Sequence, residues 1–250
     1  MPSWENRQQK KPAMGLTRNI VYTTLLLAFV AGFCDAATFT SADQLFSAHV
    51  TGNFIVFAKN LVQGADKQTW IKLISFPVYI AAVMAAGWGA PRLRNDYRLL
   101  FMEGIILFVS GALAVLLPHV SSLAPGWDAV LPFMVVAAMG IQNAFGRLYS
   151  KSVFAQTTVM TGNVTQLILE LSRRRRKRNA DGAGQSASGS GQGAPGSGQS
   201  APGSGLSIGR QTAIVAVFLG GCVVGAVAAS DFGLWTVVFP GAVLVGLGAL

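Results

Sequence analysis

The chain has 250 residues, of which 52% are hydrophobic and 12% charged, about half the charged fraction of an average soluble domain. This balance excludes an ordinary soluble globular protein and indicates an all-α polytopic membrane protein. The net charge of +9 does not indicate a nucleic-acid partner. Six of the 19 basic residues stand in one run, residues 173–178, and most of the others flank apolar segments, as the positive-inside rule predicts.

Apolar segments that approach the length of membrane helices alternate with polar stretches. After a basic, cytoplasmic tail, residues 1–19, these segments are 19–40, 45–62, 71–90, 99–117, 129–148, 153–171, 211–230 and 234–250. The basic loop PRLRNDYR follows the third segment, and the loop PHVSSLAPGWD, which has no Lys or Arg, follows the fourth. Residues 179–207 are rich in Gly, Ser, Ala and Gln, so we expect a disordered cytoplasmic linker there.

The second half of the chain repeats motifs of the first half in the same order. GFCDA at residues 32–36 corresponds to GIQNA at 140–144, and Thr-Gly-Asn follows at 51–53 and again at 161–163. These matches indicate an internal duplication. Chance similarity between Gly- and Ala-rich membrane helices is the alternative explanation.

The two segments that carry Thr-Gly-Asn contain too many polar side chains for lipid-facing helices. If every segment crossed the membrane, the basic loop 91–98 would lie outside and the loop 118–128 inside, against the positive-inside rule. If both Thr-Gly-Asn segments enter and return on one side, only a few lysines lie outside. The sequence therefore predicts about six transmembrane helices plus two re-entrant, broken helices. They form two inverted membrane repeats, 20–128 and 129–250, and both termini are cytoplasmic.

Each Thr-Gly-Asn is expected to break its segment and begin a half-helix. Glycine permits backbone torsions that other residues resist, while Thr and Asn offer hydroxyl and amide groups as caps or ligands. Such breaks bind solutes or ions in transporters. The same side chains also serve to hydrogen-bond neighbouring helices, with glycine allowing close packing, and both roles stay open. The residues are Thr51, Gly52, Asn53, Thr161, Gly162 and Asn163.

Asp35 is a carboxylate inside an apolar segment, and such groups usually face the protein interior and have a partner. His49 is the candidate partner, whereas the corresponding positions of the second repeat are the neutral Asn143 and Val159. Proton coupling or cation binding, a structural hydrogen bond, and a hydrated interfacial position are the three roles left open for Asp35. Gln142 and Asn143 form a further polar pair, expected at the same central site.

Other polar and reactive residues are expected to be structural. Glu103 lies near the basic loop and is predicted to pair with a charge at the membrane interface. Cys34 and Cys222 are interpreted as small packing residues, and Gly221 and Gly225 as a helix-packing face. No nucleophile–base arrangement, phosphate loop, metal-ligand spacing or dinucleotide motif stands out in the sequence, so we predict no enzyme activity, no cofactor and no metal.

The stretches AGFCDAATF, SAHVTGNFIVFA, GIQNAF and TTVMTGNVTQL resemble the YoaK-like family, bacterial multipass membrane proteins that carry a domain of unknown function. The resemblance covers residues 20–171 and 208–250 and implies a location in the bacterial inner membrane. The Gly/Ser-rich linker and the short C-terminal end depart from the family pattern, which leaves the length of the sixth helix open.

The sequence favours a small secondary transporter or permease for an unknown small solute or ion, with proton coupling through Asp35 as a further expectation. The alternative is a non-transporting integral membrane scaffold or accessory subunit with a packed interior. The lipid bilayer is the expected surrounding, and assembly as a homo-oligomer stays open. The predicted central site consists of Asp35, His49, Thr51, Gly52, Asn53, Gln142, Asn143, Thr161, Gly162 and Asn163.

Overall fold

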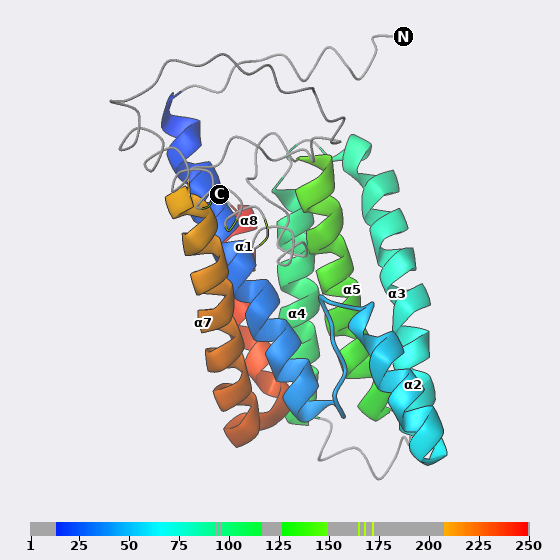
Figure 1. Ribbon diagram of the computed structural model, residues 1–250. Coiled ribbons are helices and arrows are strands. Elements are labelled where there is room, and N and C mark those ends of the chain that lie inside the picture. Colours follow the sequence, from blue (N-terminus) through cyan, green and yellow to red (C-terminus); the bar gives the residue numbers. More distant parts are fainter. Residues whose placement is uncertain are drawn as a thin grey trace, which may run out of the picture.

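The computed structural model describes residues 14–93, 95, 97–116, 127–149 and 208–249, with the single positions 165, 168 and 172. Every regular element among these residues is a helix, which confirms the all-α fold class. The second Thr-Gly-Asn, the basic run and the linker lie outside the described residues. The longer helices are α1 (Met14–Ser41), α2 (Gly52–Gly64), α3 (Lys67–Gly89), α4 (Arg98–Leu116), α5 (Trp127–Leu148), α7 (Ile208–Phe232) and α8 (Val238–Ala249), as Figure 1 shows. Helix α1 thus begins before the predicted start at Asn19.

Five segments of the described chain are long and apolar enough to cross a membrane. The last of them contains both α7 and α8, separated by a 3₁₀ turn, Gly233–Val237, at which the chain reverses direction (Figure 1). Helix α8 has 12 residues, which extend over about 18 Å, so its regular part is shorter than a bilayer core. The five segments are Ile20–Ser41, Lys67–Arg92, Arg98–Leu116, Ala129–Leu148 and Gly209–Ala249.

The outer surface of the bundle is apolar, as a lipid-facing surface requires. Helix α3 exposes Trp70, Ile80, Met84 and Trp88, and only 17% of its most apolar stretch is buried. A face of this kind is stable against hydrocarbon but not against water. The chain is therefore a multi-helix membrane protein.

The first Thr-Gly-Asn begins a short helix, as predicted. After α1 the chain turns at Asp43 and Gln44, both of which have positive φ, and runs without regular structure to the start of α2. Figure 1 shows residues 42–51 rising toward the middle of the bundle and α2 returning to the end from which they came. We call residues 42–64 the hairpin. With 13 residues, α2 extends over about 20 Å and is too short to span the membrane.

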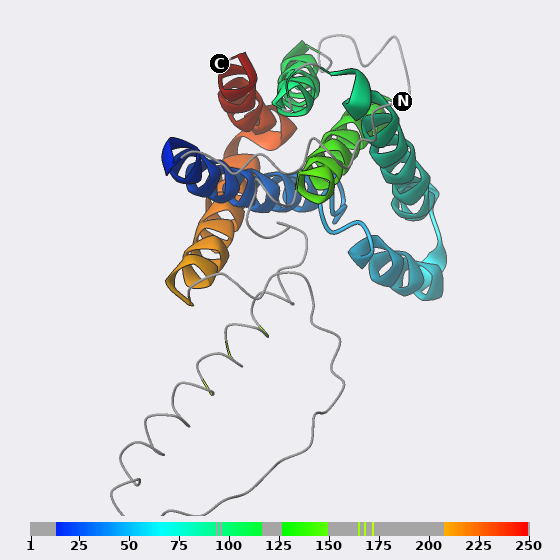
Figure 2. The same ribbon diagram turned by 90° about the horizontal axis from the view of Figure 1, so that it is seen from above.

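Small residues let the main helices approach closely. Helix α1 packs most extensively on α7, and a Cβ atom added at Gly221 would lie 2.3 Å from the Phe29 carbonyl oxygen. At Gly225 the corresponding distance to the Phe33 oxygen is 2.4 Å, which confirms the predicted packing face. Figure 2 shows α4 beside α8 on one side of the bundle and α2 beside α3 at another edge, and these pairs are in contact.

Candidate functional site

Asp35 organises the rising part of the hairpin. Its side chain is buried near the end of α1, and its Oδ1 accepts hydrogen bonds from the backbone amides of Ser47 at 2.8 Å, Ala48 at 2.6 Å and His49 at 3.3 Å. Its Oδ2 pairs with Nδ1 of His49. The predicted partnership of Asp35 with His49 is confirmed, and the carboxylate also supplies acceptors for backbone that forms no helix.

Asn53 closes the hairpin and attaches it to α3. The side chain is fully buried, its Oδ1 accepts from the Phe46 amide at 2.8 Å, and its Nδ2 donates to the Phe46 carbonyl at 2.8 Å. The same Nδ2 donates to Ser75 Oγ at 2.9 Å. Gly52 lies under the Phe46 ring, where an added Cβ would come within 2.9 Å. These contacts make Gly52 and Asn53 packing elements of the hairpin, while Thr51 precedes α2 without a capping hydrogen bond from its side chain.

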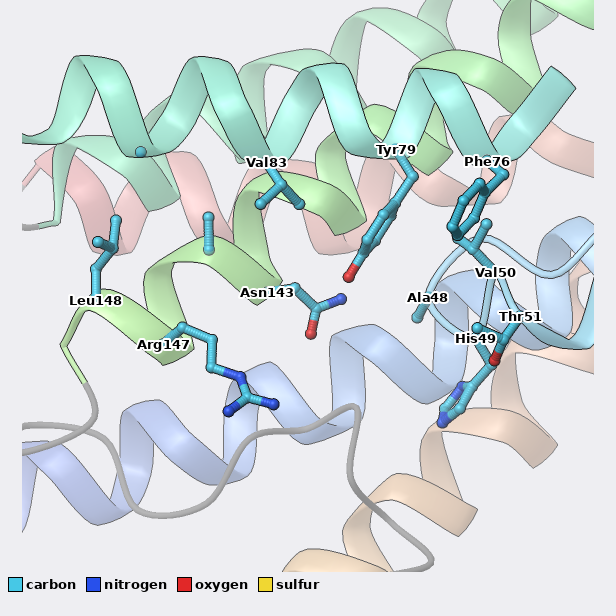
Figure 3. Close-up of a pocket in the computed structure, with 12 residues that line it drawn as sticks. Ala48, His49, Val50, Thr51, Phe76, Tyr79, Val83, Asn143, Arg147 and Leu148 are labelled. Carbon is cyan, nitrogen blue, oxygen red and sulfur yellow. The ribbon is translucent and has the colours of Figure 1, made fainter. Parts of the chain in front are cut away.

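A cavity of about 490 Å³ lies between the hairpin, α3 and α5 (Figure 3). Its polar groups come from all three elements, while the remaining wall is mostly apolar. Figure 3 shows the Tyr79 hydroxyl directed at the side chain of Asn143, to which it is hydrogen-bonded, and the Arg147 guanidinium on the other side of Asn143. A small apolar cavity with a few convergent polar groups is the usual form of a ligand site. The polar lining residues are His49, Thr51, Tyr79, Asn143 and Arg147.

The predicted site residues therefore divide into two groups. His49, Thr51 and Asn143 line the cavity, whereas Asp35 and Asn53 hold the hairpin that forms its wall. Asp35 and Asn53 hold the hairpin in place but are not lining residues of the cavity. Gln142 faces away from the lining, and its Nε2 donates to the Leu27 carbonyl of α1 at 2.8 Å. Thr161, Gly162 and Asn163 lie outside the described residues.

Two polar residues of the lining, Tyr79 and Arg147, were missed by the sequence reasoning. Tyr79 stands alone in an apolar segment, and no local pattern marks it. Arg147 follows Asn143 by four positions, so both side chains share one face of α5. That spacing is visible in the sequence, but it does not show that this face of α5 is turned toward the hairpin and α3.

The imidazole of His49 lies in the hairpin, outside the spanning helices. Its hydrogen bond with Asp35 raises the pKa of His49 above the ordinary value of 6.5, burial opposes this, and the nearby negative charge reinforces it. The His49 ring also meets the Phe218 ring edge-on at 5.6 Å, so α7 contacts the hairpin at this residue. His49 therefore connects the carboxyl group of Asp35 on α1 with the ring of Phe218 on α7.

Two charged residues are more deeply buried than the sequence suggested. Lys72 of α3 is 1% exposed and pairs with Asp43 at the base of the hairpin. Glu103 of α4 is 0% exposed, and neither carboxyl oxygen has a hydrogen-bond partner within the described structure. The predicted interfacial ion pair of Glu103 is wrong, because the rotation of α4 turns this residue toward the bundle interior, together with Leu100 and Leu107.

Comparison with known proteins gives a family but no function. A search of curated proteins and a search of solved structures each found no match. A family model described as a protein of unknown function, DUF1275, matches residues 23–250, in agreement with the resemblance to the YoaK-like proteins. Because this match covers α1 from its apolar part through α8, the chain belongs to the DUF1275 family of proteins of unknown function.

Proposed function

We propose that the protein is a small secondary transporter or permease and that the cavity between the hairpin, α3 and α5 is part of its solute path. The observation that carries this proposal is the origin of the polar lining. His49 and Thr51 come from the first predicted repeat, and Asn143 and Arg147 from the second. Transporters built from inverted repeats place their solute sites where the two repeats meet, beside broken helices.

The packing of the helices supports inverted repeats. Helix α1 packs on α7, and α5, which corresponds to α1 in the second repeat, packs on α3, which corresponds to α7. Helices α4 and α8, the last of each repeat, pack on each other. In Figure 1 α1 and α5 run in opposite directions, and so do α4 and α8. An approximate two-fold axis in the membrane plane would produce both features.

The distribution of arginines supports a cytoplasmic position for both termini. The end of α5 and the starts of α4 and α7 lie at the same end of the bundle as the start of α1 (Figure 1). These positions carry Arg147, Arg98 and Arg210. The opposite end, where α3 begins, carries Lys67. By the positive-inside rule, the arginine-rich end faces the cytoplasm of a bacterial inner membrane.

Cysteine accessibility tests the solute path. In a Cys34→Ala/Cys222→Ala background, single cysteines replace Thr51 and Val83, which line the cavity, and Val30, which is 0% exposed in the core of α1. A membrane-impermeant thiol reagent is applied separately to each face of the membrane. Alternating access predicts labelling of Thr51→Cys from both faces, because a central site opens to each side in turn, while Val30→Cys stays unlabelled.

The competing function is a non-transporting scaffold or accessory subunit. It predicts that Thr51→Cys is labelled from neither face, or from the cytoplasmic face alone if the cavity is a closed-ended pocket. Either result would overturn the transport proposal. Val83→Cys reports whether water enters the cavity at all, since it lines the α3 wall.

A further inference from the structure

Glu103 occupies an unusual position for a carboxyl group. It lies on the face of α4 that is buried against the rest of the bundle, with Leu99, Leu100, Gly104 and Leu107. At Gly104 the backbone of α8 is so close that an added Cβ would lie 2.6 Å from the Val245 amide nitrogen. Glu103 is 0% exposed, and both of its oxygens are without a hydrogen-bond partner in the described chain.

No described cation compensates this carboxyl group. Helix α8 and the 3₁₀ turn before it contain no titratable side chain, and α5 contains none between Ala129 and Phe145. The titratable side chains in the apolar part of α1 are the phenol of Tyr22, the thiol of Cys34 and the carboxyl group of Asp35, and none of them is a cation. The nearest basic residue on α4 itself, Arg98, is exposed and forms no ion pair among the described residues.

An ionised carboxylate in this position is far less stable than a neutral acid. Moving a carboxylate out of water costs several kcal/mol even after relaxation, and only a paired cation or several hydrogen bonds offset that cost. Asp35 has such compensation, because its oxygens accept backbone amides and pair with His49. Glu103 has no such compensation among the described residues, and binding a proton removes its charge without requiring a cation. Intramembrane carboxyl groups of this kind mark ion and proton pathways.

We propose that Glu103 is a proton-binding site in the membrane interior and that it holds its proton in this packed arrangement of α4 and α8. Glu103, rather than the predicted Asp35, is then the group through which the protein couples to protons. Its part in coupling rests on the proposed transport function, whereas its protonation does not.

Infrared spectroscopy of the full chain in lipid nanodiscs at neutral pH tests the protonation. The spectrum of Glu103→Gln is subtracted from that of the wild type, and Asp231→Asn, which alters an exposed carboxylate at the end of α7, is the control. We expect the difference for Glu103 to contain the carbonyl band of a carboxylic acid and the difference for Asp231 to contain carboxylate bands. Carboxylate bands in the Glu103 difference would overturn the proposal.

Two further measurements remove the dependence on one variant. Dicyclohexylcarbodiimide is an apolar reagent that adds to protonated carboxyl groups. A carboxyl oxygen bonds to the central carbon of the carbodiimide, and the acid proton moves to one of the carbodiimide nitrogens. Peptide mass spectrometry of the treated wild type should find the adduct on Glu103 and not on Asp35. Glu103→Leu should unfold at the same temperature as the wild type or higher, because it replaces an unpaired polar group by an apolar one of similar size.

The possible failures are separable. A carboxylic-acid band at Glu103 with no labelling of Thr51→Cys from both faces would leave a proton-binding site in a protein that does not transport. An adduct on Asp35 instead of Glu103, or a marked loss of stability in Glu103→Leu, would assign Glu103 a structural, charged role and contradict the proposal.

Discussion

The carboxyl group of Asp35 on α1 accepts the backbone amide of Ala48 at 2.6 Å, which attaches the middle of the hairpin to a spanning helix. The same carboxyl group holds the His49 ring at the edge of the cavity. One acidic side chain therefore fixes both the path of non-helical backbone inside the bundle and the position of a titratable lining residue. Non-helical backbone at such depth requires this kind of internal hydrogen bonding.

The pairing of His49 predicts a pH-dependent stability. Asp35 raises the pKa of His49 in the folded protein above its ordinary value of 6.5. The stabilisation is therefore complete below about pH 6.5 and is lost as the pH rises through the folded pKa. We expect the difference in unfolding midpoint between the wild type and His49→Gln to be largest near pH 6 and to shrink toward pH 9. Thermal unfolding in detergent at several pH values measures it, and a pH-independent difference would contradict the assignment.

Asn53 is predicted to be a major determinant of hairpin stability. Asn53→Ala leaves the partly buried amide and carbonyl of Phe46 without these partners, and a buried group of this kind costs roughly 1–3 kcal/mol. We expect the free energy of unfolding to fall by at least about 2 kcal/mol, measured by denaturation in mixed micelles. Asn60→Ala, on the same helix and with no hydrogen bond of this kind, should change it by less than about 0.5 kcal/mol. Equal effects of the two substitutions would show that the Phe46 contacts are unimportant.

The contact between α1 and α7 provides a matched pair of glycine substitutions. Gly221→Ala places a methyl group 2.3 Å from the Phe29 oxygen, and because this neighbour is backbone, the helices must separate. We expect a loss of about 1–3 kcal/mol in unfolding free energy. Gly220→Ala, where an added Cβ has no neighbour within 4 Å, should be neutral or stabilising by up to about 1 kcal/mol. The free energy of unfolding of both variants is measured by denaturation in the same micelles. Similar values for the two variants would show that α1 and α7 are not in close contact at Gly221.

Much of the fold was predictable from hydropathy and local chemistry. The predicted segment 129–148 coincides with the apolar part of α5, and the break at the first Thr-Gly-Asn coincides with the start of α2. Both follow from properties of a single stretch of chain. The length of an apolar run sets whether it can span the bilayer, and Thr, Gly and Asn are residues that favour the start of a helix. The partnership of Asp35 with His49 was also predictable, since a buried carboxylate needs a nearby donor.

The tertiary structure alone decided what the polar residues do. The sequence left both a ligand role and a packing role open for Asn53 and placed Gln142 at the central site. In the structure Asn53 bonds Phe46 and Ser75, and Gln142 bonds the backbone of α1. Glu103 follows a basic loop closely in the sequence, which suggested an interfacial position. In the structure it faces the interior and has no partner within the described part of the chain. A side chain in a helix points to lipid, to a neighbour or to a cavity according to the rotation of that helix about its axis. Packing against segments far away in the sequence sets that rotation. Composition and spacing therefore determined the class of protein and the break in its first repeat, whereas the cavity depends on the tertiary packing.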